Sequence, residues 1–208
     1  MEFIAAVAIG LNPYIGALIL TALVAFTPRG PETAVLAATP QALLVALTAL
    51  AGLAAPVDFV LGKFVRFAPR VRRVSQLVAP LAGGAAAAAV SQSELPLALV
   101  FAAGAAVSWS VAAMLSALAA RGSRSRAWVG LGHVPVLMAA ATAAASIIPL
   151  ALANPVVGTI LALCALGTLL LVSLAPALSG ARAGGERLYS ARGLGARRSE
   201  NVGVHVNV

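Results

Sequence analysis

The sequence predicts an all-α fold, a polytopic bundle of about six transmembrane helices. Three observations support this prediction. Hydrophobic residues make up 61% of the 208 residues and charged residues only 10%, whereas a soluble globular domain carries about 25% charged residues. The apolar residues gather in long runs. Basic connections between these runs alternate with neutral or acidic ones, a pattern typical of chains that cross a membrane repeatedly.

The first apolar run extends from Phe3 to Phe26 and is long enough to be a complete span. As a helix it would measure about 36 Å, compared with about 30 Å for the hydrocarbon core of a bilayer. Glu2 precedes the run, and the run is longer than the apolar stretch of a signal peptide. We therefore expect a retained first span.

Five further runs are candidate spans. Those at 41–56 and 77–90 are shorter than the ideal length of about 20 residues, so they must gain length from their flanks or fail to cross fully. Four complete spans with two re-entrant ones are therefore an alternative to six. The remaining runs cover 95–120, 134–153 and 156–178.

The charges between the runs provide a test of the number of spans. If all six cross, thirteen of the 14 basic residues fall on one side, and Arg29 is the exception. The positive-inside rule then places both termini in the cytoplasm. Three spans in each half also permit an inverted-topology repeat, as in many transporters.

The segment 58–76 has two helical stripes. Its basic side chains recur at intervals of three and four, at Lys63, Arg66, Arg70 and Arg73. Apolar side chains form the opposite stripe, at Val60, Phe64, Phe67, Val71 and Val74. This pattern predicts an amphipathic helix lying at the membrane surface, where Arg66, Arg70 and Arg73 would face anionic lipid headgroups.

Residues 1–178 are therefore the expected transmembrane domain, and 179–208 are expected to form a disordered cytoplasmic tail. The tail is rich in Gly, Ser, Ala and Arg and lacks the apolar residues needed for a core. A basic tail of this kind is suited to binding a membrane partner or anionic lipid.

The sequence offers little for catalysis or metal binding. It has two histidines and one cysteine, without a spacing typical of metal ligands or of a nucleophile and its base. The basic residues lie between or after apolar runs, so no soluble surface is available to bind a nucleic acid. We therefore expect no enzyme, no cofactor, no metal and no nucleic-acid partner.

Polar groups within the first run are the leading candidates for a functional site, because polar groups are costly in a membrane and often functional. They lie in the stretch Gly10-Leu11-Asn12-Pro13-Tyr14. In one interpretation Pro13 breaks the helix, and Asn12 and Tyr14 line a solute pathway. In the other, Pro13 opens the true helix, Asn12 caps it, and residues 3–11 are an interfacial lead-in.

Two further polar sites are weaker candidates. Asp58 is an acidic residue at the end of a span, where an ion pair with Lys63 or an arginine is expected, or else a site that couples to protons or cations. Asn154, followed by Pro155, lies between the last two runs and is a minor candidate for the pathway.

Three short motifs resemble a family of bacterial integral-membrane proteins grouped as a domain of unknown function. The family has Gly-Leu-Asn-x-Tyr in its first span, an acidic-Phe-Val-x-Asp-Lys segment, and Pro-Leu-Ala-Gly after it. The matching residues are Gly10, Leu11, Asn12 and Tyr14, then Asp58, Phe59, Val60 and Lys63, and then Pro80 to Gly83. Gly62 replaces the family's aspartate, which weakens any role for an ionisable pair there.

The resemblance covers roughly residues 8–178 and implies a bacterial membrane protein without an established activity. We expect it in the inner membrane. The leading functional hypothesis is a small-solute or ion transporter or channel, with a pathway lined by Asn12, Pro13 and Tyr14. The alternative is a structural or accessory subunit, as a homodimer or bound to a membrane partner or anionic lipid.

Overall fold

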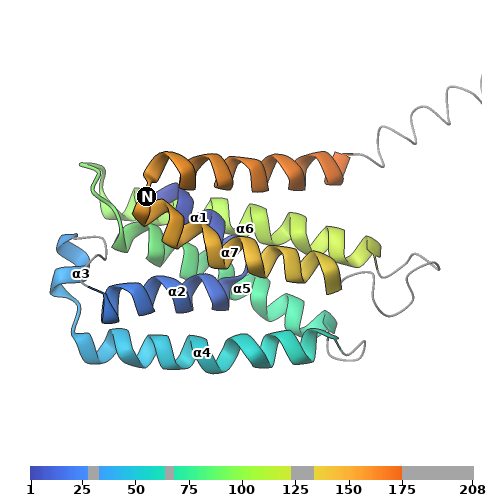
Figure 1. The fold of residues 1–208 in the computed structure, drawn as a ribbon, viewed down its shortest axis with the longest axis horizontal. Helices are drawn as coiled ribbons and strands as arrows, with labels where there is room; N and C mark the ends of the chain where they lie inside the picture. Colours follow the sequence, from blue (N-terminus) through green and yellow to red (C-terminus); the bar gives the residue numbers. More distant parts are fainter. Residues whose placement is uncertain (28–32, 64–67, 123–133, 175–208) are drawn as a thin grey trace, which may run out of the picture. The chain divides into compact units, whose positions relative to one another are not determined.

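A computed structural model of the chain describes residues 1–27, 33–63, 68–122 and 134–174, and these residues form eight helices and no strand. The helices are α1 (Glu2–Leu11), α2 (Pro13–Phe26), α3 (Ala34–Ala38), α4 (Gln41–Lys63), α5 (Ala68–Ala89), α6 (Leu97–Gly122), α7 (Val134–Ala153) and a last helix, Pro155–Leu174. The all-α class is confirmed (Figure 1). The chain divides into two units, 1–170 and 171–208, and the packing of the helices concerns the first.

Among the described residues, four helices are long and apolar enough to cross a membrane, which identifies the chain as a helical membrane protein. Their apolar windows are Gln41–Asp58, Leu97–Leu118, Val136–Ala153 and Pro155–Leu174. The run at 41–56 gains length because α4 continues to Lys63. The run at 77–90 gains length because α5 begins at Ala68, so its 22 residues measure about 33 Å.

The first apolar run does not form one span. Helix α1 ends at Leu11, Asn12 is extended (φ −153°, ψ 105°), and α2 begins at Pro13. A proline within a continuous helix would clash with the carbonyl one turn earlier, so it favours a new helix here. Helix α2 then folds back on α1, and a Cβ on Gly16 would lie 3.0 Å from the Cα of Ile9. The single span predicted over 3–26 is therefore wrong.

Two hydrogen bonds place both ends of this hairpin beside the connection between α5 and α6. The Ser91 hydroxyl donates to the carboxylate of Glu2, at the start of α1. The Thr33 hydroxyl donates to the carbonyl of Ala89, after the end of α2. The hydrogen bond from Ser91 also lowers the pKa of Glu2, which favours its charged form at this end. The hairpin is thus re-entrant (Figure 1).

The re-entrant hairpin makes the two halves of the chain different. The first half contains the hairpin, α3, α4 and α5, and the second contains three uninterrupted long helices. Neither six continuous spans nor an inverted repeat is confirmed in the described residues. The segments proposed as re-entrant, 41–56 and 77–90, belong to the longer helices α4 and α5, of which only α4 is among the four that are apolar enough to cross.

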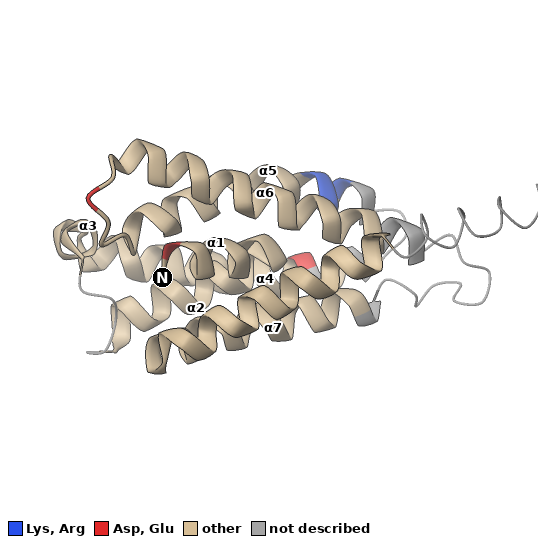
Figure 2. Cartoon of the chain, turned by 90° about the horizontal axis from the view of Figure 1, so that it is seen from above, with Lys and Arg blue, Asp and Glu red and all other residues tan. Residues whose placement is uncertain are grey.

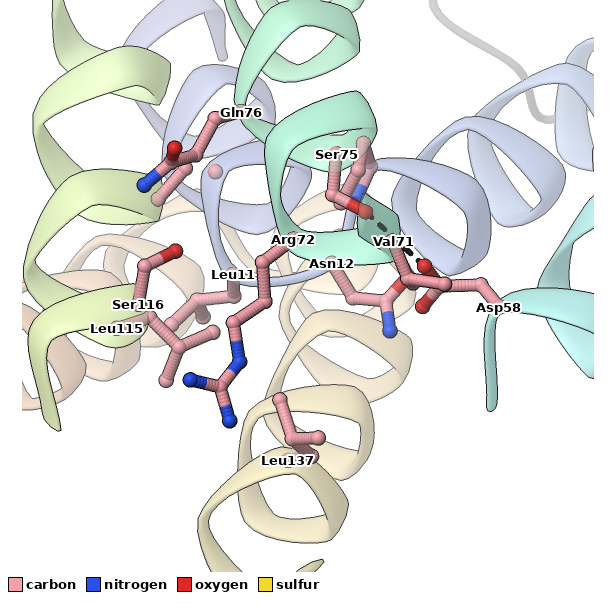
Figure 3. A pocket seen from close by; sticks show the side chains of 13 residues that line it. Leu11, Asn12, Asp58, Val71, Arg72, Ser75, Gln76, Leu115, Ser116 and Leu137 are labelled. Atoms are coloured by element: carbon pink, nitrogen blue, oxygen red, sulfur yellow. Dashed lines mark hydrogen bonds between the residues drawn. The ribbon is translucent and has the colours of Figure 1, made fainter. Parts of the chain in front are cut away.

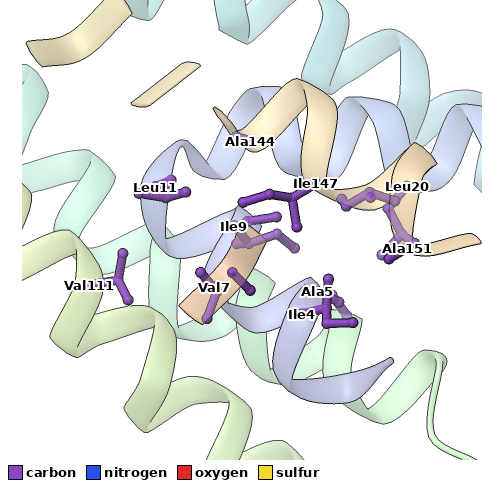
Figure 4. Packing of buried hydrophobic residues seen from close by; sticks show 14 of the residues in the cluster. Ile4, Ala5, Val7, Ile9, Leu11, Leu20, Val111, Ala144, Ile147 and Ala151 are labelled. Atoms are coloured by element: carbon purple, nitrogen blue, oxygen red, sulfur yellow. The ribbon is translucent and has the colours of Figure 1, made fainter. Parts of the chain in front are cut away.

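Helix α1 is buried along almost its whole length, although it has only ten residues. It contacts α2, α5, α6 and α7. A helix that is apolar on every side is expected to be surrounded in this way. Its side chains form the core with residues of the neighbouring helices, among them Leu20, Val111, Ala144, Ile147 and Ala151 (Figure 4).

Small residues allow α1, α5 and α6 to approach one another closely. Ser108 of α6 is fully buried, and its hydroxyl donates a 2.6 Å hydrogen bond to the carbonyl of Ala6 in α1. A Cβ on Gly10 would lie 2.7 Å from the Cβ of Val111, and one on Gly83 would overlap the side chain of Ser108. A larger residue at position 10 would force α1 away from α6, and one at position 83 would force α5 away from α6.

The helix expected at the membrane surface over 58–76 stays a prediction, because 64–67 lie outside the described residues. Its described residues belong to the end of α4 and to the start of α5. The described members of the two stripes are therefore divided between two long helices. Arg66 and the expected tail at 179–208 lie outside the described residues.

The described charges divide between the two ends of the bundle (Figure 2). Arg70, Arg72 and Arg73 lie in the first turns of α5, which we call the basic end. Glu2 begins α1 and Glu94 lies in the connection between α5 and α6, so both belong to the opposite, acidic end. Asp58 of α4 is an exception, because it lies near the basic end. The gathering of the described arginines at one end favours one orientation in a membrane.

The close packing of α5 and α6 can be tested with Gly104→Ala. A Cβ at position 104 would overlap that of Ala87 and lie 2.9 Å from the carbonyl of Gly83. We expect the variant to lose about 1–3 kcal/mol of unfolding free energy in detergent, because neither neighbour can rotate away. Gly167→Ala is the matched control, since a Cβ there meets nothing within 4 Å. Equal stability of the two variants would contradict the packing described.

The re-entrant hairpin can be tested by labelling single cysteines with a membrane-impermeant maleimide, in a Cys164→Ser background. Cysteines at Glu2 and Glu94 should react from the same side of the membrane, because the hairpin begins beside the connection between α5 and α6. A cysteine at Arg73 should react from the other side. Labelling of positions 2 and 73 from one side would mean that residues 3–26 cross the membrane once.

Candidate functional site

The structure at the tip of the hairpin agrees in part with each of the two interpretations of the stretch from Gly10 to Tyr14. Pro13 opens α2, and the side-chain oxygen of Asn12 accepts a 3.0 Å hydrogen bond from the backbone N–H of Ile15, so Asn12 is the cap. However, residues 4–11 are buried in the bundle and do not form an interfacial lead-in. The helix is broken inside the protein, as the first interpretation requires.

A polar cavity of about 70 Å³ lies at this tip, with room for a few water molecules or part of a small solute. We call it the polar chamber. Residues of six helices line it, and those with polar side chains are Asn12, Asp58, Arg72, Ser75, Gln76 and Ser116 (Figure 3). The chamber therefore brings together side chains that are far apart in the sequence.

Asp58 joins α4 to α5 at the wall of the chamber. The Ser75 hydroxyl donates a 3.0 Å hydrogen bond to a carboxylate oxygen of Asp58. The sequence led us to expect an ion pair with Lys63 or an arginine. Lys63 is the last residue of α4, and its side chain lies outside the described part of the structure. The partner of Asp58 in the described residues is thus neutral.

Arg72 is the most unusual member of the chamber. Its side chain is half-buried and extends from α5 toward Leu137 of α7 (Figure 3). Within the described residues it makes no hydrogen bond or ion pair. A charge removed from water is costly unless it is paired, so this guanidinium favours an anionic group beside it.

A helical spacing that the sequence analysis did not use connects Arg72, Ser75 and Gln76. Positions three and four apart lie on the same face of a helix, so all three side chains reach the chamber. The signal was present in the sequence. It was missed because the segment was interpreted as a helix on the membrane surface, where these side chains would face water.

The chamber lies close to the basic end of the bundle. Arg72 is four residues from the start of α5, about 6 Å along the helix, and Asp58 is five residues from the end of α4, about 7.5 Å. The buried length of α1 lies between the chamber and the acidic end. The chamber is thus nearer to one surface than to the other.

The other candidate residues lie elsewhere. Tyr14 lines an apolar groove between α2, α4 and α5 rather than the polar chamber, and it lies close to Ser75 and Asp58 at the chamber wall. Asn154 is exposed and accepts a 3.0 Å hydrogen bond from the backbone N–H of Val156, as the cap of the last helix. It lies near the end of α7 remote from Leu137. Arg70 and Arg73 are exposed and do not line the chamber.

Within the described residues, no three His, Cys, Asp or Glu side chains are grouped so that they could hold a metal ion. Comparison with known proteins finds no matching family model, no similar curated protein and no similar solved structure. The resemblance to a membrane family therefore stays a prediction. Asn12 and Asp58, from its first two motifs, line the same chamber.

The capping role of Asn12 predicts that Asn12→Ala loses about 0.5–2 kcal/mol of unfolding free energy, because the N–H of Ile15 loses its acceptor inside the bundle. Asn12→Ser should retain most of the stability, since serine is also a good cap. Unfolding in detergent measures both. If serine and alanine prove equally harmful, the side chain of Asn12 acts in some way other than capping.

Proposed function

We propose that this protein is a small-solute or ion transporter of a bacterial inner membrane, with the polar chamber as its binding site. The half-buried guanidinium of Arg72, without a partner among the described residues, is the observation that carries the proposal. It favours a solute with a negatively charged group. Asn12, Gln76 and Ser116 supply neutral hydrogen-bonding groups around it.

The proposed orientation places the basic end in the cytoplasm, as the positive-inside rule favours. The C-terminal tail then begins on the cytoplasmic side, as the sequence led us to expect. The N-terminus belongs to the opposite side, because Glu2 is bonded to Ser91 at the acidic end. This replaces the expectation that both termini are cytoplasmic, which assumed that residues 3–26 cross once.

The hairpin is the proposed gate between the two sides. A solute from the basic end needs to travel only about 6–8 Å along the helices to reach the chamber. Beyond the chamber its route is closed by α1, whose residues 4–11 are buried. Discontinuous helices of this kind, with polar groups at the break, are found at the binding sites of many transporters. Displacement of the hairpin would open the second side.

Flux into proteoliposomes tests the proposal. The wild type is compared with Arg72→Gln for chloride, small carboxylates and amino acids, with monovalent cations and neutral solutes in parallel. We expect uptake of at least one solute with a negative group, and a loss of about tenfold or more in Arg72→Gln, the size typical of a lost hydrogen bond to a charged group. Arg73→Gln is the matched control, because the neighbouring Arg73 is exposed and does not line the chamber.

Two outcomes would count against transport at this site. Liposomes that stay tight to every solute would favour the accessory-subunit hypothesis instead. Equal flux through Arg72→Gln and Arg73→Gln, with both variants folded, would leave a transporter whose pathway avoids the chamber. Size-exclusion profiles and unfolding curves of both variants distinguish a lost pathway from a lost fold.

A further inference from the structure

A second cavity, larger and apolar, lies on the other side of the hairpin. We call it the lateral groove. Its volume is about 600 Å³, and its walls come mainly from α2, α4 and α5, with Leu36 of α3 and Thr39 after that helix also lining it. Leucines of α4 face alanines of α5 across it, namely Leu43, Leu44, Leu47 and Leu50 against Ala82, Ala85, Ala86 and Ala89. Pro13 and Tyr14 of the predicted transport pathway line this groove, whereas the polar chamber shares only Pro13 with it.

The lateral groove continues into a smaller cavity of about 280 Å³. Tyr14 and Ala54 line both, so they mark the junction between the two cavities. The smaller cavity contains two charged residues, Asp58 of α4 and Arg70 of α5. We call it the charged end of the groove. One acidic and one basic group therefore lie where an otherwise apolar cavity approaches the basic end of the bundle.

The position of the groove restricts what can fill it. Its α4 wall belongs to the apolar window Gln41–Asp58, of which only 6% is buried within the protein, so this helix faces the bilayer. Apolar cavities do not hold ordered water, whereas they bind apolar molecules readily. At this depth of a membrane the apolar molecules available are lipid tails.

The two cavities together are long enough to hold one lipid tail. From Asp58 at the charged end to Leu43, they extend along 15 residues of α4, about 22 Å. One leaflet contributes half of a hydrocarbon core of about 30 Å. Because the lateral groove lies along the half of α4 nearer the acidic end, a tail that enters from the charged end would reach past the middle of the bilayer.

The two charged residues at the charged end of the groove indicate which type of lipid headgroup would bind there. An anionic lipid would pair with Arg70 but would be repelled by the carboxylate of Asp58 in the same cavity. A headgroup with one phosphate and one ammonium complements both. Arg70 lies two residues from the start of α5, about 3 Å along the helix, which places it at the level of lipid headgroups.

We propose that this groove binds one zwitterionic aminophospholipid, such as a phosphatidylethanolamine. Its tail occupies the lateral groove, its phosphate contacts Arg70, and its ammonium contacts Asp58. The basic stripe in the sequence suggested anionic headgroups, and the presence of Asp58 in the same cavity changes this expectation. The lipid site can be tested separately from the transport proposal, because Arg70 and Ala85 lie outside the polar chamber, whereas Asp58 belongs to both sites.

Native mass spectrometry of the protein released from nanodiscs tests the site. The nanodiscs contain phosphatidylethanolamine and phosphatidylglycerol in equal amounts. We expect one retained phosphatidylethanolamine for each chain. Ala85→Phe should abolish retention, because Ala85 lines the groove and a phenyl ring would occupy it. Leu81→Phe is the control on the same helix, since Leu81 is 66% exposed and does not line the groove.

A second pair of variants tests the headgroup. Arg70→Gln should weaken retention of phosphatidylethanolamine about tenfold or more, as expected for a lost charge-assisted contact. Arg73→Gln should leave it unchanged, because Arg73 does not line the charged end. Equal retention of the two lipids would overturn the proposal, as would equal effects of Ala85→Phe and Leu81→Phe. If Ala85→Phe fails to fold, the comparison of Arg70→Gln with Arg73→Gln decides.

Discussion

The close contact of α1 with α5 and α6 is the constraint on which the rest of the structure depends. A ten-residue helix cannot cross a bilayer, so its place inside the bundle must come from packing. Lipid tails are as apolar as leucine, and contacts between helices in a membrane therefore rely on close approach and hydrogen bonds. Gly10 and Gly83 permit that approach, and the bond from Ser108 to the carbonyl of Ala6 holds α1 in place.

The polar chamber is a consequence of this buried helix. Because α1 stops at Leu11, its end and the start of α2 lie inside the bundle, where Asn12 caps the new helix. Side chains from the surrounding helices line the space beyond the tip. Asp58 and Arg72 can reach that space because they lie one or two turns from the ends of α4 and α5. The tip of the hairpin thus determines where the charged groups meet.

The hairpin also separates two kinds of environment. On one side, Asn12 and Pro13 line the polar chamber. On the other, Tyr14 and the face of α2 that follows it line the apolar lateral groove. Asp58 is shared, since it lines both the chamber and the charged end of the groove. A movement of the hairpin would therefore change the surroundings of a solute and of a lipid together.

The sequence by itself determined the all-α class, the membrane character and most of the long helices, because each depends on local composition and on the length of an apolar run. It also identified Asn12 and Asp58 as polar groups in costly places. Only the tertiary structure decided that residues 3–26 turn back at Asn12, and that Arg72 reaches the same chamber. The physical reason is that an apolar run has the same composition whether it crosses a membrane or folds back within it. The choice depends on contacts such as those of Ser91 with Glu2 and of Ser108 with Ala6, which join residues about 90 to 100 positions apart in the chain.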